Sequence, residues 1–161
     1  VTGVQTCALP IWYWGWLEYK MVFATNGIVD KKEKLKSAIE ILTQTVEEDI
    51  SFSHINEVLL NKIVINEYSK SYLTKEVDRE NKDGYFIIYK RLVNRLHEMI
   101  VALDGSYPYP SSLASTILEG SLHQYFLQEH FPMLTDCNET TTPTEYFMDL
   151  AFRALKPKHH G

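Results

Sequence analysis

Arg91 and His97 are the two residues of this chain whose chemical types, at short spacing, could carry out a reaction. They lie in the stretch KRLVNRLHEMI with five residues between them. An arginine can hold a phosphate through charge-assisted hydrogen bonds, and a histidine can exchange a proton near neutral pH. The pair could therefore support RNA cleavage without a metal ion.

A straight α-helix separates these two side chains. Six positions at 100° per residue amount to about 600°, which leaves the side chains roughly 120° apart around the axis. The alternative interpretation is an exposed helix face on which Arg91 and Arg95 repel each other and Glu98 compensates. The catalytic hypothesis therefore requires Arg91 to lie at the frayed start of its helix.

Glu119, His123 and His130 are weak candidates for a metal site on one helix face. Carboxylate-bridged sites in bundles repeat a Glu-x-x-His pair on two helices, and this chain has no second copy. We therefore predict no metal site. The chain also lacks glycine-rich nucleotide loops, HExxH and Gly-x-Ser-x-Gly, so we predict no cofactor.

Five helices are predicted to position these residues, on the basis of apolar residues recurring every three or four positions. Asp30 with Glu33 forms a capping pattern before the first helix, and Thr142-Pro143-Thr144-Glu145 forms another before the last. Ser111 or Ser112 is the predicted cap of the fourth helix. The predicted helices cover residues 31–48, 54–73, 85–103, 112–130 and 143–155.

The predicted fold class is mainly α: a compact helical bundle of four or five helices in a single domain over residues 30–156, followed by a flexible tail at 157–161. A minor β-ribbon around Asp83-Gly84 is the alternative for one segment. Gly120, in the middle of a predicted helix, indicates either close approach of another backbone or simple tolerance, and we favour tolerance. The predicted core contains Leu35, Ile39, Leu42, Leu59, Ile63, Leu92, Leu96, Ile100, Ile117, Leu118, Leu122, Phe126, Phe147 and Leu150.

The first eleven residues, VTGVQTCALPI, resemble the translation of a widely used sequencing-adapter primer, residue for residue. This resemblance implies that residues 1–11 are not native, and we expect them to make no consistent contacts with the core. Residues 12–29 are then either a leader or an aromatic N-terminal segment, and the native start is either upstream of Trp12 or at Met21. If native, Trp12, Trp14 and Trp16 could form a docking strip or an interfacial anchor.

The stretch NRLHEMIVALDGSYPYPSSLASTILEGSLHQYFLQEH resembles HEPN-like helical domains of prokaryotic defence and toxin systems. It has two apolar helices joined by a short loop with Gly and Pro, and Arg91 and His97 fall within the loose arginine–histidine spacing of that family. The resemblance implies a metal-independent ribonuclease that acts as a dimer. Leu92 stands where the family usually has a polar residue, so the alternative implied by the resemblance is an inactive relative of such a ribonuclease.

Composition and charge favour a different function. The formal net charge is −5, which disfavours general attraction to nucleic acids. Apolar runs are far shorter than the ~20 residues that span a bilayer, so no membrane association is expected. Cys137 is the single cysteine outside residues 1–11, which is typical of a cytoplasmic protein. We predict a non-enzymatic interaction or regulatory module, either by itself or as part of a longer protein, that binds a protein partner or forms a homodimer. RNA is a partner only under the ribonuclease alternative.

Overall fold

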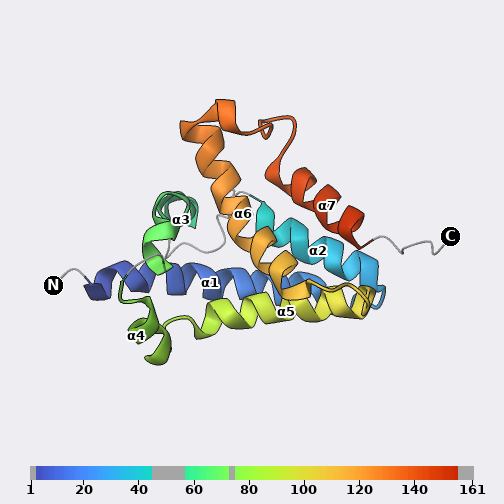
Figure 1. The fold of residues 1–161 in the computed structure, drawn as a ribbon, viewed down its shortest axis with the longest axis horizontal. Coiled ribbons are helices and arrows are strands. Elements are labelled where there is room, and N and C mark those ends of the chain that lie inside the picture. Colours follow the sequence, from blue (N-terminus) through green and yellow to red (C-terminus); the bar gives the residue numbers. More distant parts are fainter. Residues whose placement is uncertain (1–2, 45–56, 73–74, 156–161) are drawn as a thin grey trace.

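The computed structural model describes residues 3–44, 57–72 and 75–155 (Figure 1). Within these ranges the regular structure consists of seven α-helices and one short 3-10 helix, without a strand. The mainly α prediction is confirmed, although the helices outnumber the four or five predicted. The β-ribbon prediction is wrong, because the residues before Asp83 form a short helix. The expected flexible tail at 157–161 lies outside the described residues.

Five of the helices match predicted ones, whereas α1 and α4 were not predicted. Asp30 caps α2, its carboxylate accepting from the Glu33 amide at 2.8 Å, and Thr142 and Glu145 form the predicted capping box of α7. Pro110, rather than a serine, opens α6, because the missing N–H of a proline leaves nothing unpaired at a first helical position. The elements are α1 (Gly3–Thr25), α2 (Lys31–Thr43), α3 (Glu57–Tyr72), α4 (Val77–Lys82), α5 (Ile87–Leu103), α6 (Pro110–His130), η1 (Pro132–Leu134) and α7 (Pro143–Ala154).

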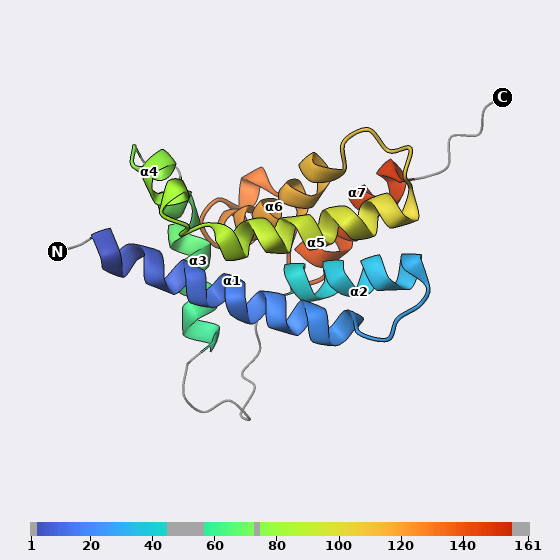
Figure 2. The same ribbon diagram turned by 90° about the horizontal axis from the view of Figure 1, so that it is seen from below.

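The most extensive helix contacts join α5 with α6 and α1 with α2. In both ribbon views α1 and α5 lie side by side and run in the same direction, while α2 returns antiparallel to them (Figures 1 and 2). α6 crosses α5 and α2, and α7 packs on α2 and α6. α3 packs on α1 and α6. This arrangement leaves α1 at an edge of the bundle.

The core extends to α1, a segment that sequence reasoning left undecided. Tyr13, Trp14, Leu17 and Met21 are buried together with apolar residues of the other helices. Aromatic edges join two helices here, since the Trp14 ring meets the Tyr89 ring at 5.2 Å in a T-shaped contact. The buried residues of the predicted core are Leu35, Ile39, Leu42, Leu92, Leu96, Ile100, Ile117, Leu118, Leu122 and Phe147, with Phe126 and Leu150 partly buried.

Leu59 is an incorrect core prediction, because its side chain is 54% exposed. The buried side of α3 is formed by Asn61, Val64 and Ile65 instead, with Ile63 partly buried. Asn61 donates a hydrogen bond to the hydroxyl of buried Tyr13 at 3.3 Å. A buried polar group needs a partner, and this bond provides one for Asn61 on the side of α3 that faces α1.

Gly120 is required by close packing, contrary to the preference for simple tolerance. A methyl group at this position would lie 2.6 Å from the tip of the Phe147 ring of α7. Phe147 is itself buried, so its ring has little room to move away. The close neighbour is therefore an aromatic side chain rather than another backbone.

The N-terminal residues enter the structure as the beginning of α1, whose backbone is helical from Gly3. The side chains of residues 3–10 lie outside the described part, and so does the expectation that residues 1–11 make no consistent core contacts. Among the helices described, none combines the length and the apolar character needed to cross a bilayer.

Candidate functional site

Arg91 and His97, the predicted catalytic pair, lie on different sides of α5. The Arg91 guanidinium donates from Nε and Nη2 to the two carboxylate oxygens of Glu18, at 2.6 and 2.5 Å. His97 Nδ1 lies 2.9 Å from the Ser111 hydroxyl at the start of α6. The structure therefore gives each member of the pair its own neighbouring helix and does not bring the two together.

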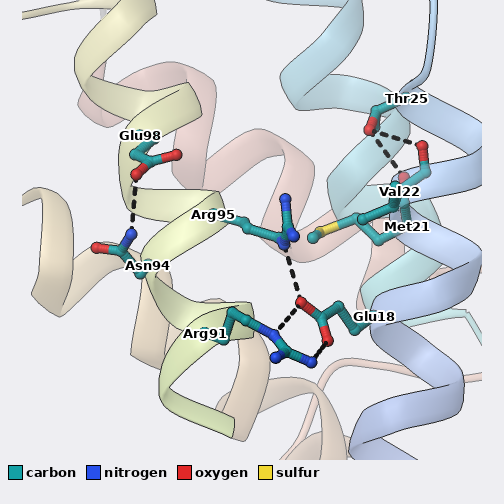
Figure 3. Close-up of polar contacts among 8 residues, drawn as sticks. All are labelled: Glu18, Met21, Val22, Thr25, Arg91, Asn94, Arg95 and Glu98. Atoms are coloured by element: carbon teal, nitrogen blue, oxygen red, sulfur yellow. Dashed lines mark hydrogen bonds and ion pairs between the residues drawn. The ribbon is translucent and has the colours of Figure 1, made fainter. Parts of the chain in front are cut away.

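Glu18 of α1 is the centre of a charged cluster that sequence reasoning missed. Figure 3 shows its carboxylate between Arg91 and Arg95, with Arg95 Nε donating at 2.9 Å. The Glu18 side chain is only 8% exposed, whereas both arginines reach solvent. Hydrogen bonds from Arg91, and then from Arg95, hold the pKa of Glu18 below its ordinary value of 4.5, against an opposing effect of burial.

The same contacts correct the expected charge balance on α5. Arg91 and Arg95 were expected to be compensated by Glu98, which lies on their own helix. Glu98 instead accepts a hydrogen bond from Asn94 at 2.9 Å, and Glu18 on α1 forms ion pairs with both arginines (Figure 3). The cluster therefore ties α1 to α5, and two of the Arg91 nitrogens, Nε and Nη2, are engaged by a carboxylate rather than left for a phosphate.

The three weak metal candidates of α6 do not converge. Glu119 accepts a hydrogen bond from the Tyr89 hydroxyl, His130 Nε2 lies 2.9 Å from the side-chain oxygen of Asn66, and His123 is exposed. Over the described ranges, no group of three His, Cys, Asp or Glu side chains is placed to hold a metal ion.

A cavity of about 330 Å³ opens between α1, α2 and α5. Lys31, Lys34 and Arg95 line it together with one carboxylate, that of Glu98, and the apolar side chain of Met99. Its lining therefore carries a net positive charge, although the whole chain carries −5. Such a lining attracts small anions.

The outward side of α1 presents a row of aromatic side chains. Trp12, Tyr19 and Phe23 are 63%, 61% and 75% exposed, and the Tyr19 and Phe23 rings stack at 6.3 Å. Trp16 is partly buried in the same row, with Lys20 Nζ over its ring at 4.7 Å. At 100° per residue these four aromatic residues fall within about 60° of the helix circumference. We call Trp12, Trp16, Tyr19 and Phe23 the outer stripe of α1.

The outer stripe differs from the docking strip suggested by the sequence. That strip grouped the three tryptophans, yet Trp14 is 6% exposed and belongs to the core. Tyr19 and Phe23 take its place. The signal that would have identified them is their spacing, because residues four, three and four apart lie along one side of a helix, whereas residues two apart do not.

Comparison with known proteins adds no assignment to these features. No protein-family model, no curated protein and no solved structure matches the chain. The contacts, charges and exposed surfaces described above are therefore the basis for a function.

Proposed function

We propose that this chain is a non-enzymatic helical interaction module whose binding surface is the outer stripe of α1. The observation that carries the proposal is the exposure of Trp12, Tyr19 and Phe23 on one side of a helix whose opposite side is core. Large aromatic side chains that are exposed together are typical of binding surfaces, because each offers much apolar area at small entropic cost.

The physical reason is the cost of leaving this stripe in water. An ordinary surface helix is polar on the side away from the core, whereas α1 is apolar on both sides between Trp12 and Phe23. A partner that covers the outer stripe removes this apolar area from water, and the hydrophobic effect then favours the complex. We assign the module to the cytoplasm, which the single cysteine outside residues 1–11 supports.

No contact between described residues supports the ribonuclease alternative. Catalysis requires Arg91 and His97 to face one substrate, and they contact Glu18 and Ser111 on separate helices. We therefore do not propose RNA as a partner.

The proposal is tested by selecting helix-forming peptides from a displayed library on the immobilised protein. We expect enriched peptides to bind the unmodified chain and to bind a Tyr19→Ser/Phe23→Ser variant at least about tenfold more weakly, since these positions would be hot spots. The matched control is Tyr146→Ser on α7, where an aromatic residue is also exposed but lies outside the stripe. Peptides that bind the Tyr19→Ser/Phe23→Ser variant as tightly as the Tyr146→Ser control would place the binding surface elsewhere and contradict the proposal.

A further inference from the structure

We infer that the occupant of the outer stripe is a second copy of this chain, with the two α1 helices antiparallel across a two-fold axis. The inference rests on the proposed function and names the partner of the same surface. Its basis is the order of the four aromatic residues, the apolar area they expose and the charges around them.

The order of the outer stripe is the same in both directions along the helix. Trp12, Trp16, Tyr19 and Phe23 are separated by four, three and four positions. In an antiparallel pair with its axis between Leu17 and Glu18, Trp12 therefore lies opposite Phe23 of the second copy, and Trp16 opposite Tyr19. A two-fold interface requires this reciprocity, since residue i must meet residue j and j must meet i.

The spacing also suits helix pairing. Steps of four and three residues keep side chains on one seam of a helix, as in antiparallel bundle and coiled-coil contacts. The stripe spans eleven residue steps, or about 17 Å of helix axis. Each aromatic side chain therefore has an aromatic neighbour across the pair, where offset or edge-on ring contacts form readily.

The exposed area matches the apolar part of a small stable interface. Trp12, Tyr19 and Phe23 are 63%, 61% and 75% exposed. With roughly 200 Å² per aromatic side chain, these residues expose roughly 400 Å² per copy and roughly 800 Å² per pair. Stable interfaces bury about 1,200–2,000 Å² in total, and somewhat more than half of that area is apolar.

The few charged residues of α1 would not repel a second copy of the helix, and they offer little to attract a charged partner. Between Trp12 and Thr25 the helix has two charged residues, Glu18 and Lys20. Glu18 is directed at Arg91 and Arg95 of α5, away from the stripe, and Lys20 lies over the Trp16 ring. The stripe therefore offers aromatic surface without a carboxylate, and a second aromatic stripe is its natural complement.

The oligomeric state of the full chain is the first measurement. Sedimentation equilibrium at increasing protein concentration should give a mass approaching twice the 18.7 kDa of one chain. Tyr19→Glu, which places a charge near the two-fold axis, should raise the dissociation constant at least about 30-fold. Tyr146→Glu on α7 should not, and circular dichroism should show unchanged helix content in both variants.

The direction of pairing is tested by cross-linking in a Cys7→Ser/Cys137→Ser background. An equimolar mixture of Trp12→Cys and Phe23→Cys chains should form a covalent heterodimer on mild oxidation, whereas each variant alone should not. A parallel pair would give the reverse result and overturn the antiparallel arrangement.

The two proposals fail in distinguishable ways. A chain that stays monomeric at all concentrations overturns the second-copy inference, yet selected peptides that require Tyr19 and Phe23 would still support the interaction module. A dimer whose mass is insensitive to Tyr19→Glu would place the interface away from α1 and overturn the inference as well. Both proposals are contradicted if the chain is monomeric and the selected peptides bind equally well without Tyr19 and Phe23.

Discussion

The two sides of α1 have the same kind of residues and opposite surroundings. The inner side places Tyr13, Trp14 and Leu17 in the core, while the outer side leaves Trp12 and Phe23 in water. Composition therefore says little about which aromatic side chains of this helix are structural. What separates them is the helical angle, because a step of two residues moves a side chain by about 200°. The inner side contributes to the core, whereas the outer side is the surface for which we propose association.

The largest effect is expected from deleting most of α1, which removes its inner residues together with Trp12, Trp16 and Tyr19 of the outer stripe. Deleting residues 1–20 eliminates Tyr13, Trp14 and Leu17 from the core and Glu18 from the charged cluster. Since truncating one large core side chain costs about 2–5 kcal/mol, and whole domains are stable by about 5–15 kcal/mol, this chain should not fold. The measurement is its circular dichroism and thermal melt. Deleting only residues 1–11 is the control and should leave a cooperative transition.

A single substitution on each side gives a sharper contrast. Trp14→Ala should lower the free energy of unfolding by about 3–5 kcal/mol, because it opens a cavity beside Tyr89. Trp12→Ala, two residues away and 63% exposed, should change it by no more than about 0.5 kcal/mol. Urea denaturation of both variants at micromolar protein concentration compares the two values. Equal losses would show that both sides of α1 are packed.

Glu18 tests the electrostatic attachment of the inner side. Glu18→Gln should cost about 1–2 kcal/mol at pH 7, because the two arginines it pairs with are partly solvated. Since its folded pKa lies below 4.5, the unfolded chain takes up this proton first, and the stabilisation is complete above about pH 4.5 and is lost as the pH falls further. The difference between the two proteins should therefore shrink in denaturation curves measured from pH 7 to 3.

A matched control for this measurement lies on α7, where Asp149 pairs with Arg153. Both side chains are well exposed, so Asp149→Asn should change stability by no more than about 0.5 kcal/mol. A Glu18→Gln effect of the same size would mean that the cluster does not hold α1 against α5.

The smallest expected effect on the folded monomer comes from the outer side. Phe23→Ala should change the stability of the dilute protein by no more than about 0.5 kcal/mol. At higher concentration the unmodified chain should melt at a higher temperature, since association stabilises the folded state, and the variant should lose this dependence. Melting curves over a hundredfold range of concentration measure it. A concentration-independent melting temperature of the unmodified chain would argue against an association through this side.

The fold was predictable where one helix side is apolar and the other polar. Such patterns, with the caps at Asp30 and Thr142, located five helices, although the predicted ends at 45–48, 54–56 and 73 lie outside the described residues. α1 lacks this contrast because both of its sides carry aromatic residues. Leu59 was misplaced because the buried side of α3 is formed by Asn61, Val64 and Ile65, with Asn61 bonded to Tyr13, 48 residues away. Apolar spacing within one helix contains no information about such a bond.

The contacts of the candidate site were harder to predict, because they join residues that lie far apart in the sequence. The 120° separation of Arg91 and His97 could be calculated from their spacing alone. In the structure Arg91 contacts Glu18 of α1, and His97 contacts Ser111 of α6. Glu18 could not be matched to Arg91, because the two lie 73 positions apart and meet only when α1 packs on α5. The outer stripe could have been recognised from its spacing, although its exposure depends on the whole bundle.

The contact between Gly120 and Phe147 restricts how this chain can diverge. A methyl group at position 120 would lie 2.6 Å from the tip of the Phe147 ring, so the sizes of the residues at positions 120 and 147 depend on each other. Among homologous chains, an aromatic residue at position 147 should accompany glycine at 120, and any larger residue at 120 should accompany a shorter one at 147. Gly120 of α6 thereby leaves room for the Phe147 ring of α7, and a larger residue at position 120 would force α7 to shift.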